Sequence, residues 1–331
     1  MKNNELLEKL LQKYYGDNGK PLQYENPWRA SHWEHLKDKF SIEKDENGNV
    51  AKMSGYGGFG NMLYKSHFLK YVFEFLLYCY WFIRLPYKKQ IVYFYNKAKL
   101  ISKQMEIFFV FENFRQVLTL SVIDSYLSKK IKNKPYNFLM IGDGYGFLSA
   151  LAKKCFPDSR FFLVDLGETL AFQYFYIQKS FPGSKHIGIF GLETNEDLSE
   201  YDFIYCPTEY LETLSGLNFD ICINTCSMQE MNIQSIERYF TFMRHNVSTE
   251  NLFYCANREY KELRGGEVSE FDKYPWDKND HFIFKDYCPW LNFSIQRMGA
   301  IQPKFLGIKI PFIEINPVKS KHALTVLASS N

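Results

Sequence analysis

The sequence lacks any uninterrupted apolar run long enough to cross a membrane. Its most apolar stretch, residues 68–85, is broken by Lys70, Glu74 and Arg84. The longest unbroken part, Phe75–Ile83, is far shorter than the roughly twenty residues that a spanning helix needs. We therefore expect a buried helix and no stable membrane insertion, with peripheral membrane contact as the alternative. Residues 1–11 lack the apolar core of a signal peptide and predict a short amphipathic helix.

The sequence also lacks closely spaced cysteine pairs and a strong excess of charge of one sign. The seven cysteines are odd in number and not tightly spaced, which argues against a disulfide framework. Cys222 and Cys226 could share a strand face, but no second ligand pair follows, so we predict no zinc site. We expect mostly reduced, buried thiols in a cytoplasmic protein. A formal charge of +3 and a pI near 8.3 give no indication of nucleic-acid binding.

The remaining composition is that of a globular protein. A chain of 331 residues, 46% hydrophobic and 23% charged, can form one large α/β domain with an accessory region. The aromatic fraction of 18% is high. These rings either fill the core or, in part, line a cleft for a carbohydrate or another flat-faced ligand.

The most informative stretch is Asn137–Gly146, in which an apolar run suited to a buried strand leads into a G-x-G-x-G turn. A helix-like run follows, and a second apolar run, Phe161–Val164, stops on Asp165. This is the layout of a nucleotide-binding βαβ unit, whose acid can hold two ribose hydroxyls. The sequence therefore predicts an adenosine-containing cofactor. The alternatives are that the turn is only a strand-to-helix loop and that Asp165 is a helix N-cap.

The glycine spacing discriminates between cofactors. Dinucleotide binders usually show G-x-G-x-x-G, whereas the third glycine here comes one residue early, at Gly146. The turn contains no Lys or Arg, and no G-K-[S/T] follows, which excludes a P-loop. The G-x-G-x-G form is typical of class I methyltransferases, which use S-adenosylmethionine.

The chain divides into two predicted regions. Residues 1–132 are expected to form a mostly helical N-terminal cap. Residues 133–331 alternate strands with helices, which predicts an α/β fold with a mainly parallel, Rossmann-like sheet and helices on both faces. We expect strands near 138–141, 160–164, 187–190, 203–206, 219–224, 251–255 and 323–328, and helices near 147–156, 168–181 and 233–244. The strand ends carry polar residues, so one shared cleft is predicted there.

A second polar set follows the predicted strand at 219–224 and lies in the run Ile223–Met231. This run, the glycine turn and Val164–Glu168 resemble the sugar O-methyltransferases encoded in bacterial surface-polysaccharide clusters. Shorter resemblances are found at Ser31–Trp33, Cys255–Arg258 and Tyr274–Trp276. The resemblance covers most of residues 135–290. It departs at Asp143 and Gly167, where Gly and Pro are expected.

The resemblance implies a class I methyltransferase sheet and a cytoplasmic enzyme that methylates a sugar hydroxyl of a capsule or O-antigen precursor or glycan. Its partner would be a sugar or a sugar nucleotide; the sequence allows a homo-oligomer without indicating one. The implied S-adenosylmethionine site comprises Gly142, Asp143, Gly144, Gly146, Asp165, Leu166, Cys206, Pro207, Asn224 and Thr225. Ser227, Gln229 and Arg258 would contact the acceptor.

A sugar hydroxyl is a poor nucleophile at neutral pH, so a general base or a divalent metal such as Mg²⁺ must assist its attack. Glu230 is the leading candidate for the base or metal ligand; alternatively, its carboxylate only stabilises a helix N-terminus. His32 and His281 are further candidate bases, because each neighbours tryptophan and charged residues. No H-x-x-x-H pattern or cluster of aspartates marks a metal site, so we assign no metal ligands.

Three other functions stay open at this point. The acceptor could be another small molecule, such as a peptide or a polyketide, methylated on oxygen or nitrogen. A nicotinamide-dependent oxidoreductase would have to bind a dinucleotide, against which the glycine spacing argues. A non-catalytic module would bind S-adenosylmethionine without turning over any sugar.

Overall fold

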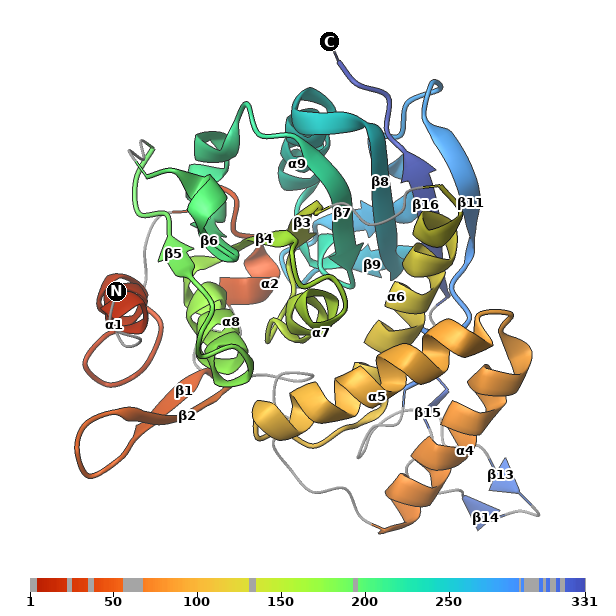
Figure 1. Ribbon diagram of the computed structural model, residues 1–331, viewed down its shortest axis with the longest axis horizontal. Helices are drawn as coiled ribbons and strands as arrows, with labels where there is room; N and C mark the ends of the chain where they lie inside the picture. The colour runs from red at the N-terminus through yellow and green to blue at the C-terminus, as the bar shows by residue number, and fades with distance from the viewer. Residues whose placement is uncertain are drawn as a thin grey trace.

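An eight-stranded sheet forms the centre of the protein (Figure 1). The computed structural model describes residues 5–22, 26–34, 39–55, 68–130, 135–192, 196–291, 293–294, 304–305, 308–309, 314–315 and 319–330. The strand order is β11-β16-β8-β7-β3-β4-β6-β5. The strands are β3 (Asn137–Ile141), β4 (Arg160–Asp165), β5 (His186–Gly188), β6 (Phe203–Pro207), β7 (Phe219–Thr225), β8 (Val247–Arg258), β11 (His281–Tyr287) and β16 (Ser320–Val326).

The sheet is mainly parallel, as the sequence predicts. β3 to β8 pair in parallel, and only β16 runs antiparallel, to β8 on one side and β11 on the other. Each strand range expected from the sequence is occupied by a strand. The predicted strand at 187–190 is shorter and ends at Gly188, and β8 begins earlier than expected, at Val247.

Helices cover both faces of the sheet, which confirms the predicted α/β fold. Alternate residues of each strand point to opposite faces, and two apolar cores result. Phe138 and Met140 pack in the core on one side, together with α1, α5, α6, α7 and α8. Leu139 and Ile141 pack on the other side, with α9. The helices are α1 (Glu5–Tyr14), α2 (Ser31–Glu34), α4 (Phe68–Arg84), α5 (Lys88–Gln104), α6 (Phe111–Lys130), α7 (Phe147–Cys155), α8 (Gly167–Ser180) and α9 (Ile233–Asn246).

Short elements complete the described chain. Four two-stranded sheets pair β1 (Ser41–Lys44) with β2 (Val50–Ser54), β9 (Tyr260–Glu262) with β10 (Val268–Glu270), β12 (Phe293–Ser294) with β15 (Glu314–Ile315), and β13 (Lys304–Phe305) with β14 (Ile308–Lys309). The 3-10 helices are η2 (Leu198–Glu200), η3 (Thr208–Leu214), η4 (Met228–Glu230) and η5 (Phe271–Lys273). All seven cysteines are free. Within the described ranges, no helix is sufficiently long and apolar to span a membrane.

The N-terminal segment packs directly against the sheet layer. Tyr14, at the end of α1, is buried and donates a hydrogen bond from its hydroxyl to Glu209 (2.8 Å). Tyr15 donates to the backbone carbonyl of Glu168 in α8 (3.0 Å). The ring of Tyr14 lies against Gly167, where any side chain would overlap it. The predicted amphipathic N-terminal helix is thus confirmed, and it packs on α8. The division of the chain into two regions at residue 132 stays a prediction.

We predict that Gly167→Ala lowers the free energy of unfolding by about 1–3 kcal/mol, the usual cost of overpacking a filled core. The added methyl group would overlap the Tyr14 ring. Gly183→Ala is the matched control, because nothing lies within 4 Å of a side chain added there, and its effect should stay within about 0.5 kcal/mol. Urea unfolding measures both; equal stability of the two variants would contradict the close contact between α1 and α8.

Candidate active site

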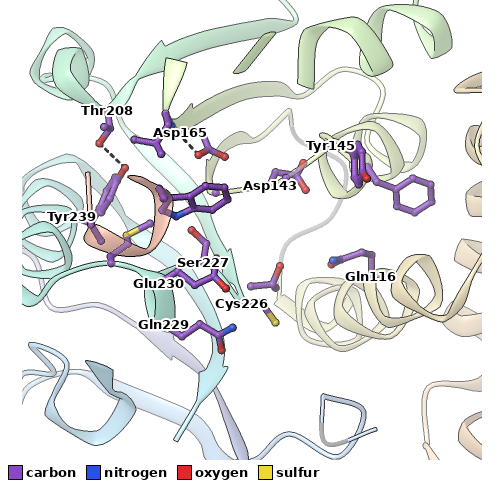
Figure 2. A pocket seen from close by; sticks show the side chains of 18 of the residues that line it. Gln116, Asp143, Tyr145, Asp165, Thr208, Cys226, Ser227, Gln229, Glu230 and Tyr239 are labelled. Atoms are coloured by element: carbon purple, nitrogen blue, oxygen red, sulfur yellow. Dashed lines mark hydrogen bonds between the residues drawn. The ribbon is translucent and has the colours of Figure 1, made fainter. Parts of the chain in front are cut away.

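A cavity of about 280 Å³ opens at the carboxyl ends of the central strands (Figure 2). Parallel strands place all their carboxyl ends on one edge of the sheet, and the residues that follow β3, β4, β6 and β7 meet there. The predicted site residues that line the cavity are Gly142, Asp143, Gly144, Asp165, Leu166, Thr225, Ser227, Gln229 and Glu230. The structure therefore brings the glycine turn and the second polar set into one cavity.

The glycine turn uses conformations and spaces that only glycine fits. Gly142, Gly144 and Gly146 all have positive φ angles, of 70°, 58° and 75°. A side chain on Gly142 would overlap Ser227, and one on Gly146 would press on Ile177 of α8. Gly142 is thus in contact with the loop after β7, while Gly146 lies behind the cavity and lets α7 pack on α8.

Asp143 caps helix α7. Its carboxylate accepts hydrogen bonds from the backbone N–H groups of Leu148 (3.2 Å) and Ser149 (2.7 Å) and from the Ser149 hydroxyl (2.5 Å). Burial raises the pKa of Asp143 to about 6, although these hydrogen bonds oppose the shift. The side chain that departs from the expected glycine therefore lines the cavity and occupies the N-terminus of α7.

Asp165 ends β4 with its carboxylate beside the cavity. One oxygen accepts from the backbone N–H of Leu166 (2.8 Å) and the other from the Gln173 side chain (2.7 Å). Burial raises the pKa of Asp165 to about 8, and the nearby carboxylates of Glu168 and Asp143 add to the shift. A donor supplied by a ligand would stabilise the ionised form.

The residues after β6 and at the end of β7 differ in what they contact. Cys206 and Pro207 are buried in β6 and do not line the cavity; the next residue, Thr208, does. Thr208 shares a hydrogen bond with the Tyr239 hydroxyl (2.8 Å). Asn224 is also buried, donates to the Ile141 carbonyl (2.9 Å) and accepts from Met228 N–H (3.2 Å). Cys206 and Asn224, expected to touch a cofactor, are therefore in positions that support the surrounding loops.

The loop after β7 is tightly fixed. Cys226 has a positive φ of 59°, an uncommon conformation for a residue with a side chain. Its N–H donates to the Ala256 carbonyl (2.7 Å), and the N–H of Gln229 donates to Asn257 (3.0 Å). The side-chain oxygen of Gln229 accepts from the backbone N–H of Arg258 (2.8 Å). These bonds to β8 hold Ser227, Gln229 and Glu230 at the cavity wall.

Glu230 forms a small charged group with two other side chains. Its Oε1 accepts a hydrogen bond from Lys261 (2.7 Å) and lies 3.7 Å from Nε2 of His32. Burial lowers the pKa of His32, and the positive charges of Lys261, Arg264 and Arg258 lower it further against the opposite effect of Glu230. His32 does not line the cavity itself, but a neutral imidazole adjoins the Glu230 carboxylate at neutral pH.

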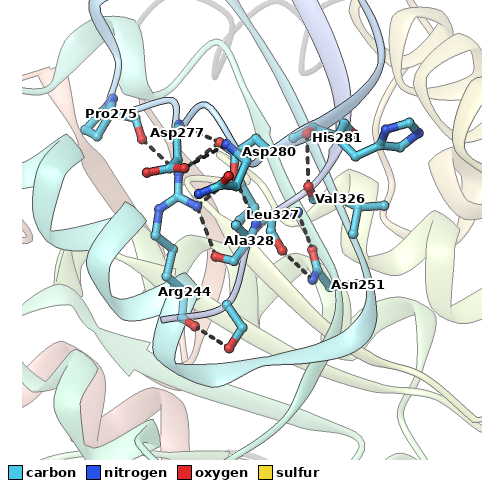
Figure 3. A network of polar contacts seen from close by, with 12 residues as sticks. Arg244, Asn251, Pro275, Asp277, Asp280, His281, Val326, Leu327 and Ala328 are labelled. Atoms are coloured by element: carbon cyan, nitrogen blue, oxygen red, sulfur yellow. Dashed lines mark hydrogen bonds and ion pairs between the residues drawn. The ribbon is translucent and has the colours of Figure 1, made fainter. Parts of the chain in front are cut away.

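His281 lies at the opposite edge of the sheet. β11 is parallel to β8, so His281, its first residue, lies with the amino ends of the parallel strands. The neighbouring Asp280 pairs with Arg244 through both carboxylate oxygens, at 2.7 and 2.9 Å (Figure 3). Asp280 is the charged neighbour that made His281 a candidate base in the sequence. It belongs to a network that joins α9 to the chain around β11. His281, a candidate base from the sequence, therefore lies away from the cavity and is not brought together with the other predicted site residues.

Two walls of the cavity have no counterpart among the residues expected from the sequence. The N-terminal wall comprises Trp28, Arg29, Ala30 and Trp33, and the α6 wall comprises Glu112, Asn113, Arg115 and Gln116. Arg29 forms a buried ion pair with Glu168, and Arg238 lies 4.2 Å from the ring centroid of Trp28. In the sequence, the two nearby tryptophans, Trp28 and Trp33, indicate the first wall. No feature of the α6 sequence indicates the second.

The described residues contain no group of three or more His, Cys, Asp and Glu side chains arranged to hold a metal ion. Two of the carboxylates at the cavity are bound within the protein: Glu230 accepts a hydrogen bond from Lys261, and Asp143 accepts one from the backbone of α7.

Comparisons with known proteins show structural similarity at low sequence identity. The sequence matches no family model, and no curated protein is significantly similar to it. Similar solved structures include an O-methyltransferase family protein from Burkholderia thailandensis (8% identity, TM-score 0.35, 67% of this chain and 59% of that chain). They also include coclaurine N-methyltransferase bound to N-methylheliamine and SAH (11%, 0.36, 51% and 49%) and TrmN from Thermus thermophilus (9%, 0.36, 62% and 48%). The chain aligns with about half the length of the last two, and similarity at this level identifies neither reaction nor substrate.

We predict that Asp165 and Asp143 contribute a loss of stability as the pH rises from about 4 to 8, because the folded protein holds protons on both groups that the unfolded chain releases near its ordinary carboxyl pKa. Asp165→Asn should remove part of this dependence. At pH 8.5 the variant should exceed the parent protein by on the order of 1 kcal/mol, with little difference at pH 5.

Urea unfolding at the two pH values measures this effect. Asp158→Asn, a change at an exposed position, is the control and should leave the pH dependence unaltered. An Asp165→Asn variant whose stability changes with pH just as that of the parent protein does would contradict the raised pKa of Asp165.

Proposed function

We propose that the protein is an S-adenosylmethionine-dependent O-methyltransferase whose acceptor is a sugar hydroxyl, in a surface-polysaccharide precursor or glycan. The observation that carries the proposal is the meeting of three features in one cavity: the glycine turn, the Asp165 carboxylate, and the set Ser227, Gln229 and Glu230. The first two suit an adenosine, and the third provides polar groups beside it.

The residues present suit a cofactor without phosphates better than a dinucleotide. A pyrophosphate binds at the N-terminus of the helix that follows the glycine turn. In this protein the Asp143 carboxylate already accepts the N–H groups of Leu148 and Ser149 at the start of α7. A pyrophosphate would meet a negative charge and occupied donors there. This contact argues against the nicotinamide-dependent oxidoreductase, independently of the glycine spacing.

The cofactor supplies an electrophilic methyl group, and the protein must orient the acceptor and take its proton. In this proposal Asp165 holds the ribose hydroxyls, and Ser227 and Gln229 lie close to the acceptor. Glu230 accepts the proton of the attacking hydroxyl, with His32 as the adjoining alternative base, 3.7 Å away. Lys261 holds the Glu230 carboxylate in place through its 2.7 Å hydrogen bond.

A sugar acceptor is supported by the resemblance of the motifs and by the aromatic N-terminal wall. Trp28 and Trp33 line the cavity, and flat aromatic faces suit the apolar faces of sugar rings. Arg258 is the last residue of β8 and contributes a positive charge near His32. In this proposal it contacts an anionic group of the acceptor. A peptide or polyketide acceptor has no comparable support from the residues of the cavity.

The first test is titration calorimetry with S-adenosylhomocysteine, NAD and NADP. We expect binding of S-adenosylhomocysteine alone, and Asp165→Ala should weaken it by about 1–3 kcal/mol through loss of a charge-assisted hydrogen bond. Asp158→Ala is the control and should bind normally. Binding of a dinucleotide in place of S-adenosylhomocysteine would overturn the proposal, and unchanged affinity in Asp165→Ala would overturn the role of Asp165.

The second test concerns the base. With S-adenosylmethionine and a panel of sugar nucleotides, with and without Mg²⁺, we expect Glu230→Gln to reduce turnover by about 10²–10⁴-fold and to leave the affinity for S-adenosylhomocysteine unchanged. Glu237→Gln, at an exposed position of α9, is the matched control. Full activity of the Glu230 variant would exclude Glu230 as the base.

A further inference from the structure

A buried carboxylate on α6, that of Glu112, belongs to the wall of the cavity. Glu112 is 9% exposed and lines the cavity. Among the described residues, none forms a hydrogen bond with its Oε2 atom. Gln116, one helical turn later on the same wall, also has a side-chain oxygen without a described partner. Because an unpaired buried acceptor is costly, these two atoms indicate a place where a ligand supplies hydrogen-bond donors.

A positive charge accompanies this carboxylate. Arg115 lines the same wall of the cavity, and its charge is felt at Cys226, where it opposes the rise in the pKa of the thiol caused by burial. A carboxylate and a guanidinium three residues apart on one helix are adjacent on its surface. The pair is complementary to a group that carries both an ammonium and a carboxylate, as the end of an α-amino acid does.

The strand order places this pair on the side of the glycine turn away from Asp165. β4 and β6, with Asp165 and Thr208, lie on one side of β3, and β7 lies on the other. Arg115 is near Cys226, at the end of β7. Figure 2 shows Gln116 extending from its helix toward the cavity, across from Thr208 and Tyr239. A ligand whose ribose is held by Asp165 and which crosses the glycine turn therefore ends at α6.

We propose that the α6 wall binds the amino-acid end of the cofactor: Glu112 accepts hydrogen bonds from its ammonium group, and Arg115 donates to its carboxylate. This assignment rests on the proposed function, because the cofactor must be S-adenosylmethionine or its demethylated product. It makes α6, which precedes the glycine turn in the chain, a part of the cofactor site. Gln116 supplies a second acceptor next to the ammonium group.

The test compares two ligands that differ only at this end. S-adenosylhomocysteine carries the amino-acid group, whereas methylthioadenosine has the same adenosine and sulfur without it. By calorimetry we expect Glu112→Gln and, separately, Arg115→Gln to weaken S-adenosylhomocysteine by about tenfold or more, as expected for loss of a charge-assisted hydrogen bond. The affinity for methylthioadenosine should stay within about twofold of the parent value in both variants.

Two controls make the comparison specific. Glu237→Gln removes an exposed carboxylate on α9 and should change neither affinity. Asp165→Ala should weaken both ligands, because both contain the ribose. Thermal unfolding of each variant checks that it is folded. Glu112→Gln keeps the shape of the side chain, and Arg115→Gln tests the same site independently.

The outcomes separate this inference from the proposed function. If the parent protein binds neither ligand, the proposed function fails and the inference with it. If the parent binds S-adenosylhomocysteine and the two α6 variants bind it equally well, only the inference fails. An equal loss of both ligands in the variants would also overturn it, since that would indicate a general disturbance of the cavity rather than contact with the amino-acid end.

Discussion

The site depends on the close approach of two loops at the ends of neighbouring parallel strands. β3 and β7 pair in register from Phe138 opposite Ile221 to Ile141 opposite Asn224, and their following residues, Gly142 and Ser227, are in contact. Only glycine permits this contact, because a side chain at position 142 would occupy the space of Ser227. The glycine turn therefore does more than approach a ligand: it also lets the loop that carries Glu230 reach the same cavity.

Several acidic side chains are buried around this contact, and their burial is unfavourable for the protein without a ligand. Asp143 and Asp165 are buried near each other, and burial raises the pKa of both. Glu112 adds a third buried carboxylate on the same cavity. Such groups are costly without partners, and a site of this kind gains when a ligand provides donors and positive charge. The ion pair between Arg29 and Glu168 shows the opposite case, in which a buried carboxylate has its counterion within the protein.

The sequence anticipated the elements that a local pattern encodes. Apolar runs of strand length, the three glycines and an acid at a strand end are all local, and each is found where the pattern placed it. Cys206 and Asn224 lie at strand ends as expected, but which way a side chain points there depends on its neighbours: Cys206 is buried within β6, and Asn224 is bound to Ile141 and Met228. His281 was misplaced because its strand, β11, joins the sheet through β16, a pairing that no local pattern reveals.

The sequence by itself determined the βαβ unit, the parallel sheet and the position of Asp165 at its edge, because apolar runs of strand length and the conformational freedom of glycine act over a few neighbouring residues. Only the tertiary structure decided that Trp28 and Trp33 close the cavity from one side and that Glu112 and Arg115 face it from α6. Those walls arise from contacts between segments far apart in the chain, such as Arg29 with Glu168. Contacts of that kind depend on how helices pack across the sheet, and no short stretch of sequence encodes them.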